Sequence, residues 1–175
     1  MSKSRFTVRQ LTTGGIIGAA YVALTLLAAA ANLAYGPIQF RFSEALCVLP
    51  FLFPEATWGL FAGCLIMNLL SPYGLLDIVL GSLATLLAAL LTQHSRSRIL
   101  APLPPVLCNG ILVGGVIAFE QVGFTSAFWA AFAYNGLTIA VGEAAACYAL
   151  GLPLLRLLPG VRPLKKYMAA ERVHL

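Results

Sequence analysis

Long apolar runs fill the chain over residues 11–158, and the short breaks between them are rich in proline, glycine or charge. Such runs are typical of membrane-spanning helices, because about 20 apolar residues cross the hydrocarbon core of a bilayer. If short or tilted spans are allowed, the pattern predicts about six helices. Their expected ranges are 12–34, 38–53, 56–70, 76–93, 103–121 and 127–152.

Composition supports the same class. Hydrophobic residues make up 60% of the 175 positions and charged residues 10%, whereas about 25% of a soluble domain is charged. The first apolar run, residues 11–31, is longer than the ~7–15 residues of a secretory signal core, and equally apolar segments follow it. We therefore expect a retained first helix and one all-α, multi-pass transmembrane domain over residues 1–175.

The basic residues predict how the chain is oriented. With the N-terminus inside and six crossings, ten of the eleven basic residues fall in cytoplasmic segments, and only Arg41 does not. The ten are Lys3, Arg5, Arg9, Arg96, Arg98, Arg156, Arg162, Lys165, Lys166 and Arg172. The positive-inside rule therefore predicts cytoplasmic termini, with a basic cytoplasmic tail at 159–175. This topology explains the net charge of +5 without a nucleic-acid partner.

Motifs for metal binding and catalysis are missing from the sequence. The four cysteines lie singly inside apolar segments, and His94 and His174 are far from any carboxylate cluster, so no metal site is expected. No phosphate-binding loop, nucleophile elbow or zinc-binding H-E-x-x-H pair is present. We therefore expect neither ATP hydrolysis by this chain nor enzymatic activity.

Ionisable groups within the apolar runs mark a candidate site, because burying one in a membrane costs from about 2.5 kcal/mol upward. Arg41 and Glu44 are three residues apart, so they share one face near the outer end of the second helix. Two interpretations stay open for them. They form a structural ion pair, or they line an outward-facing pocket and bind a polar ligand.

A second group of polar residues surrounds the turn between the third and fourth helices. Asp77 begins the fourth helix, where it either caps free N–H groups or contacts a ligand. Asn68 closes the third helix just before the same turn. We expect Asn68, Tyr73 and Asp77 to converge at the outer face. Tyr73 either stacks on a flat ligand or anchors the membrane interface.

Glu143 is the most informative residue because it lies deep inside the last apolar run. Asn135 is eight residues earlier, which places both side chains on similar faces of a helix. An acid at that depth should face the bundle interior, and we favour a ligand contact over a structural hydrogen bond. Asn109, in the fifth helix, is expected to form a helix-to-helix hydrogen bond.

Small residues cluster on the first helix. Gly14, Gly15, Gly18, Ala19 and Ala23 give overlapping small-xxx-small spacings that allow close backbone approach. Such a face suits either packing within the bundle or docking to another membrane protein.

Several sequence segments together resemble the queuosine-precursor transporter family called QueT. They are RFSEAL at 41–46, NLLSP at 68–72, GLLDIV at 74–79, GSLAT at 81–85, LAPLPPV at 100–106, and GEA at 142–144 with GLP at 151–153. The resemblance runs from the first helix to residue 158.

The resemblance implies a substrate-binding S component of an energy-coupling factor (ECF) transporter, with six transmembrane helices, in the plasma membrane of a prokaryote. Such a component holds no cofactor of its own. It works with two cytoplasmic ATPases, which use ATP, and a transmembrane coupling protein. Ala19, Ala23 and Gly15 resemble the docking motif for that module. The implied substrate is a 7-deazaguanine base, such as queuine or a preQ-type base, taken up from outside.

Chemistry links this implied ligand to the polar residues. One carboxylate can accept the adjacent N–H donors of a guanine-like edge, and a second can hold an aminomethyl cation. Glu143 and Asp77 suit those roles, the asparagines could read the remaining edge, and an aromatic side chain could cover the ring. The expected substrate-binding set is Glu143, Asp77, Asn68, Glu44, Arg41, Asn135 and Tyr73.

Three alternatives remain. An S component could carry another vitamin or nucleobase, since members of one fold bind different ligands. A stand-alone carrier would use Glu143 for proton coupling. An intramembrane enzyme would use Glu143 and Asp77 as acid and base, but no nucleophile, metal cluster or cofactor motif accompanies them.

Overall fold

The computed structural model describes residues 7–33, 40–71 and 74–172, and within these ranges the regular structure is helical, with no strand. This confirms the all-α class. Among the described residues, three helices are long and apolar enough to cross a membrane, namely Val8–Ala30, Leu103–Val122 and Phe128–Gly160. Three shorter apolar helices are Phe42–Phe51, Ala56–Leu69 and Asp77–Gln93. These helices lie close to the predicted ranges, while the count of six crossings stays a prediction.

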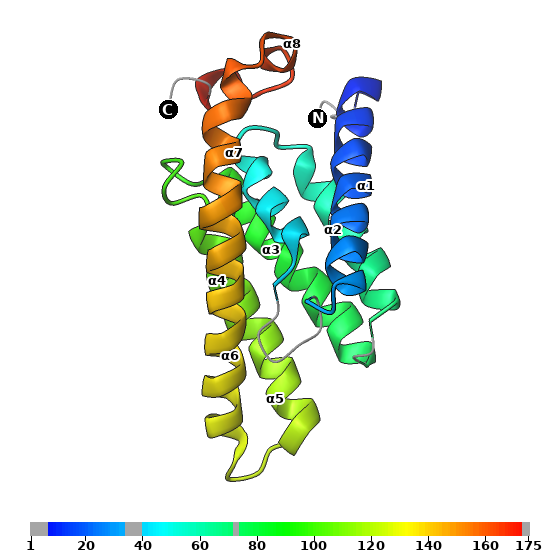
Figure 1. Ribbon diagram of the computed structural model, residues 1–175, viewed down its shortest axis with the longest axis vertical. Helices are drawn as coiled ribbons and strands as arrows, with labels where there is room; N and C mark the ends of the chain where they lie inside the picture. The colour runs from blue at the N-terminus through cyan, green and yellow to red at the C-terminus, as the bar shows by residue number, and fades with distance from the viewer. Residues whose placement is uncertain (1–6, 34–39, 72–73, 173–175) are drawn as a thin grey trace, which may run out of the picture.

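The chain winds into an elongated bundle (Figure 1). Its α-helices are α1 (Val8–Ala30), α2 (Ala56–Leu69), α3 (Ser82–Gln93), α4 (Leu103–Cys108), α5 (Gly114–Val122), α6 (Phe128–Ala144), α7 (Leu152–Leu157) and α8 (Arg162–Lys165). Three 3₁₀ segments are η1 (Phe42–Phe51), η5 (Leu158–Gly160) and η6 (Ala170–Arg172). Three π-helical turns are η2 (Asp77–Gly81), η3 (Asn109–Val113) and η4 (Ala145–Gly151). Each π turn lies within a longer helix. α4, η3 and α5 form one continuous helical rod, and α6, η4 and α7 form a second rod beside it.

Glycine brings α1 and α2 into backbone contact. A Cβ atom at Gly18 would lie 2.6 Å from the carbonyl oxygen of Gly59, and one at Gly63 would lie 2.8 Å from that of Gly18. The contact continues to Gly14, because a Cβ atom at Gly59 would come closer still to the carbonyl oxygen of Gly14. These spacings leave no room for side chains, so the two helices pack through their backbones.

The second apolar segment departs from the expected helix over 38–53. It forms a 3₁₀ helix of 10 residues, η1, in the centre of the bundle, with residue 41 at its N-cap. Side chains three residues apart eclipse one another in a 3₁₀ helix, so Arg41 and Glu44 are aligned along it. η4 approaches η1 closely, since a Cβ at Gly151 would lie 2.9 Å from the carbonyl oxygen of Ala45.

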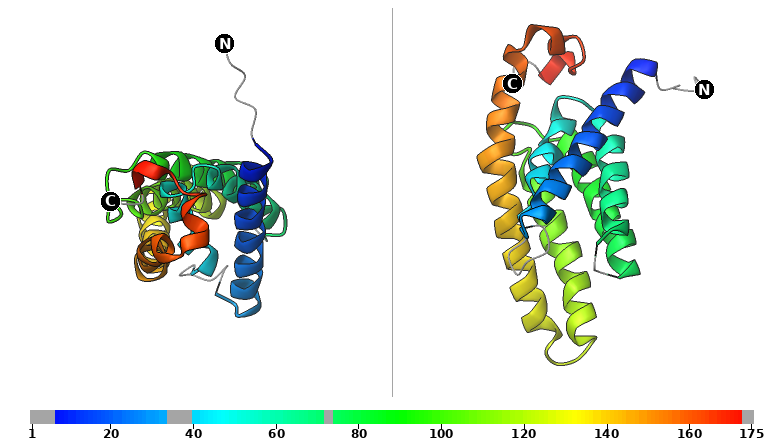
Figure 2. Two further views of the ribbon diagram at one scale, coloured as in Figure 1. Left: turned by 90° about the horizontal axis from the view of Figure 1, so that it is seen from above. Right: turned by 45° about the vertical axis from the view of Figure 1, so that its right-hand side comes forward.

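The end of the chain folds back onto the bundle, at the end where α1 begins (Figure 2). The backbone N–H of Ala169 donates to the carbonyl of Leu52 at 2.8 Å. The Arg172 guanidinium donates to the backbone carbonyls of Gln93, the last residue of α3, and Ser95, just beyond it. Residues 162–172 of the predicted basic tail are thereby attached to η1 and α3.

The contact between α1 and α2 predicts that Gly59→Ala destabilises the protein. The added methyl group has no space beside Gly14, so the helices must separate, at a cost of about 1–3 kcal/mol. Thermal unfolding of the detergent-purified protein should show a lower midpoint. Gly15→Ala is the matched control, because nothing lies within 4 Å of that added methyl group. Equal midpoints for the two variants would contradict this packing.

Candidate functional site

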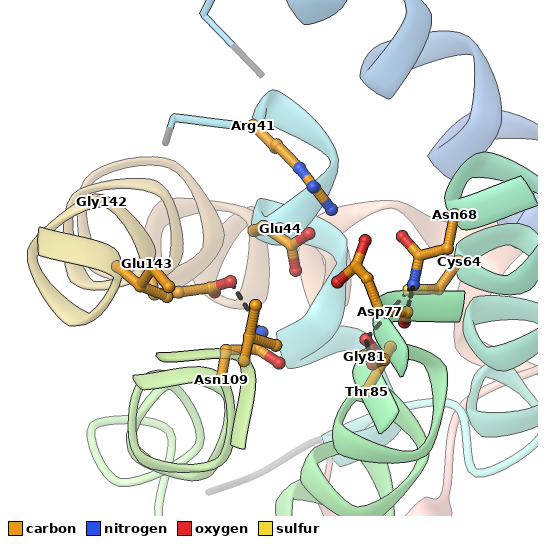
Figure 3. A pocket seen from close by; sticks show the side chains of 12 residues that line it. Arg41, Glu44, Cys64, Asn68, Asp77, Gly81, Thr85, Asn109, Gly142 and Glu143 are labelled. Carbon is orange, nitrogen blue, oxygen red and sulfur yellow. Dashed lines mark hydrogen bonds between the residues drawn. The ribbon is translucent and has the colours of Figure 1, made fainter. Parts of the chain in front are cut away.

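A polar pocket lies inside the bundle, where η1, α2, η2, α3, η3 and α6 converge (Figure 3). Its lining residues are Arg41, Glu44, Cys64, Asn68, Asp77, Gly81, Thr85, Asn109, Val113, Ile139, Gly142 and Glu143. The cavity measures about 30 Å³, enough for a few water molecules. Ligand pockets usually measure about 300–1,000 Å³, so a bicyclic base would require the lining side chains to move apart.

Glu44 is buried and held from two elements. The Tyr21 hydroxyl, from α1, donates to Glu44 Oε1 at 2.6 Å, and Cys47 Sγ donates to Oε2 at 3.1 Å. Tyr21 is fully buried. The carboxylate of Glu44 therefore ties η1 to α1 beside the pocket.

Glu143 faces the bundle interior, as predicted, and only 8% of its surface is exposed. Asn109 Nδ2 donates to Glu143 Oε1 at 2.6 Å, which joins η3 to α6. This bond confirms the helix-to-helix hydrogen bond expected of Asn109. Cys147 Sγ lies 3.9 Å from the other oxygen, Oε2, one helical turn along the same rod.

Asn68 and Asp77 meet, as expected from their positions around one turn. Asn68 Nδ2 donates to the backbone carbonyl of Asp77 at 3.3 Å and to Ser82 Oγ at 3.3 Å. The Asp77 carboxylate accepts a hydrogen bond from Ser71 Oγ at 3.2 Å. Tyr73, the third residue expected here, lies outside the described residues.

Charge is unevenly distributed around the pocket. Its lining holds three acids, Glu44, Asp77 and Glu143, and Arg41 is its basic residue. The Arg41 side chain points toward Glu44 and Asp77 (Figure 3). A lining rich in acceptors suits a ligand that presents N–H donors or a positive charge.

Asn135, expected in the substrate-binding set, is not among the residues that line this pocket. Its Nδ2 donates to Gln121 Oε1 at 2.8 Å and to the Ala131 carbonyl at 2.9 Å. A spacing of eight residues places Asn135 and Glu143 on similar faces of the helix but separates them by about 12 Å along its axis. The shared face therefore does not bring Asn135 into the same pocket lining as Glu143.

Two lining features were missed by the sequence analysis. Gly81 makes room for the acid and amide beside it, since a Cβ there would lie 2.9 Å from Asp77 Oδ1 and 3.0 Å from Asn68 Nδ2. π-helical turns also surround the pocket, because Asp77 begins η2, Asn109 begins η3, and η4 follows Glu143. Such turns are frequent at functional sites, but the sequence carries no simple signal for them.

The small residues of α1 divide into two sets. Gly14 and Gly18 are buried against α2, whereas Gly15, Ala19 and Ala23 are exposed on the outside of the bundle. The first set therefore serves packing within the chain. The second set lies on an exposed face of α1, which is the face expected to dock to a partner.

The four cysteines are free and buried. Among the described residues, no group of three or more His, Cys, Asp or Glu side chains is arranged to hold a metal ion.

A family model described as QueT transporter matches residues 11–159. Over 86 residues the chain is 37% identical to a protein named "Queuosine precursor transporter QueT" from Lactococcus lactis subsp. cremoris (strain MG1363). This match covers 49% of this chain and 49% of that relative, so it spans about half the length of each. No solved structure matches the chain.

The close fit around Gly81 predicts that Gly81→Ala weakens ligand binding more than it lowers stability. The added methyl group must displace the ends of the Asp77 and Asn68 side chains, which are short and can shift. For the ligand that occupies this pocket we expect about a tenfold loss of affinity by calorimetry, with little change in unfolding midpoint. Gly115→Ala is the control, because its nearest neighbouring atom would be 3.7 Å away. Unchanged affinity in Gly81→Ala would exclude Asp77 and Asn68 from the binding site.

Proposed function

The chain belongs to the QueT transporter family, and from that premise we propose that it binds a 7-deazaguanine precursor of queuosine, such as queuine or a preQ-type base, for uptake. The name of the Lactococcus lactis relative supports this class of cargo. We further propose that the protein acts as the S component of an ECF transporter.

The observation that carries the proposed cargo is the cluster of buried carboxyl groups in an apolar bundle. Each buried acid costs free energy in a membrane, and such groups usually mark a substrate or ion site. A 7-deazaguanine presents a ring N–H beside an exocyclic amino group, which one carboxylate accepts in a bidentate manner. Glu143 is suited to that edge, Asp77 to an aminomethyl cation, and Arg41 to the ring carbonyl.

The absence of a nucleotide-binding motif from the sequence agrees with ATP hydrolysis by partner subunits. In our proposal, two cytoplasmic ATPases and a transmembrane coupling protein supply the energy. The exposed face of Gly15, Ala19 and Ala23 lets a partner helix approach the α1 backbone closely.

We also propose that the six apolar segments all enter the membrane, with both termini cytoplasmic. The start of α1 and the C-terminal segment lie at the same end of the bundle (Figures 1 and 2). Arg9, Arg162, Lys165 and Lys166 are exposed near that end. The positive-inside rule favours placing it in the cytoplasm of a prokaryotic cell.

We predict that the purified protein binds queuine and that Glu143→Gln weakens this binding by about 10- to 100-fold. The substitution keeps the size of the side chain but removes the charge, and a hydrogen bond to a charged group contributes about 1.5–3 kcal/mol. Calorimetry with queuine measures the effect, and Glu120→Gln, at an exposed residue outside the pocket lining, is the control.

Adenine, guanine, thiamine, riboflavin and biotin serve as comparison ligands in the same titration. Binding of a comparison ligand alone would keep the S-component assignment and replace the cargo. Queuine binding that is identical in Glu143→Gln and the wild type would remove Glu143 from the site.

The docking proposal predicts a variant that binds but does not transport. Ala19→Leu combined with Ala23→Leu should leave queuine affinity unchanged and reduce uptake at least tenfold in cells that carry the ECF module. Ala130→Leu with Ala133→Leu provides matched bulk at exposed positions of α6. Uptake that persists without the ATPases and collapses with the proton gradient would instead identify a stand-alone carrier.

A further inference from the structure

Asn109 carries a buried acceptor that has no hydrogen-bond partner in the part of the chain that the structure describes. The residue is 5% exposed, and its Nδ2 donates to Glu143 Oε1 at 2.6 Å. Its Oδ1 is buried but accepts no hydrogen bond from any of the described residues. The carboxylate fixes the orientation of the amide, because only the NH₂ group can donate to Glu143. The amide oxygen therefore does not take part in the contact with Glu143 and stays available as an acceptor.

An acceptor left in this position is costly. A buried polar atom without a hydrogen bond destabilises a protein by about 1–3 kcal/mol, and native structures contain few of them. Asn68, in the same pocket, shows the usual situation, since its Nδ2 has both Asp77 and Ser82 as acceptors. Asn109 lines the pocket, so a bound molecule with an N–H group can reach its oxygen.

The backbone holds Asn109 firmly against α6. A Cβ at Gly114 would lie 2.6 Å from the Cα of Gly136, and one at Gly110 would lie 3.2 Å from the Gly136 carbonyl oxygen. η3 and the start of α5 therefore pack closely against the backbone of α6 on the side of Asn109 toward Gly136. Such support fixes the relative positions of Asn109 and Glu143 before a ligand arrives.

We propose that Asn109 Oδ1 and the Glu143 carboxylate form one continuous acceptor edge that recognises the exocyclic amino group of the ligand. This inference rests on the proposed function and makes it more specific. The carboxylate accepts the ring N–H and one amino N–H. Asn109 Oδ1 accepts the second amino N–H, which the carboxylate cannot reach in the same bidentate arrangement.

The arrangement selects for aminopyrimidinone rings over analogues without the amino group. A base lacking that group leaves Asn109 Oδ1 and one carboxylate lone pair buried and unpaired. Sites built to hydrogen-bond a polar group reject analogues that lack it far more strongly than apolar pockets reject a missing methylene. Asn109 is thus a specificity residue as well as a support for Glu143.

The test compares 7-deazaguanine with 7-deazahypoxanthine, which differ in the exocyclic amino group. Both are titrated against the full-length protein in detergent, by competition with queuine where binding is weak. We expect the wild type to prefer 7-deazaguanine by about 100-fold, since two hydrogen bonds are lost with the amino group. Asn109→Ala should reduce this preference about tenfold.

The Asn109→Asp variant distinguishes recognition of the ligand's amino group from structural support of Glu143. A carboxyl group that shares one proton with Glu143 donates through one oxygen, as the amide did, and keeps an acceptor at the other. We expect the preference of Asn109→Asp for 7-deazaguanine over 7-deazahypoxanthine to stay within about threefold of the wild-type preference. The inference would be overturned if Asn109→Ala and Asn109→Asp lost this preference equally, or if the preference of Asn109→Ala were unchanged.

The wild-type measurement stands on its own if a variant fails to fold. Queuine binding without any preference for the amino group overturns the role of Asn109 and leaves the proposed cargo intact. Absence of both queuine and 7-deazaguanine binding overturns the proposed function and this inference together.

Discussion

The structure depends on the need to satisfy acidic side chains inside an apolar bundle. Glu44 of η1 accepts a hydrogen bond from Tyr21 of α1, and Glu143 of α6 accepts one from Asn109 of η3. Hydrocarbon offers no competing partners, so each donor must come from the protein, and Tyr21 and Asn109 each donate from another helix. The bonds that make the acids tolerable therefore also fix the helices relative to one another, and the pocket lies where they meet.

Much of the fold could be predicted from the sequence, because apolar runs report helices directly. The ranges found for α2 and for the α4–α5 rod lie close to those expected. Glu143 faces inward, as expected, because exposing an acid to lipid at that depth costs free energy. Asn68 and Asp77 also met as expected, since the turn between them limits their separation. Local reasoning was sufficient wherever the relevant partner lay nearby in the sequence.

The remainder depends on contacts that local reasoning does not supply. The helical face shared by Asn135 and Glu143 gave no information about depth, so Asn135 bonds to Gln121 at a different level of the bundle. The division of the α1 small residues follows from where α2 lies, which only the tertiary structure reveals. Likewise, the unpaired oxygen of Asn109 depends on the position of Glu143, 34 residues away.

The π-helical turns affect how this site can change during evolution. A π turn contains one residue more than an α turn would need, and one residue of an α-helix corresponds to about 100° of rotation. Deleting a single residue within η3 could restore a regular helix and rotate one side of the rod relative to the other. Residue 109 or its neighbours would then present a different side chain to the pocket, while the flanking helices kept their hydrogen bonds. Changes of chain length by one residue thus offer a route to new ligand preferences within the same set of helices.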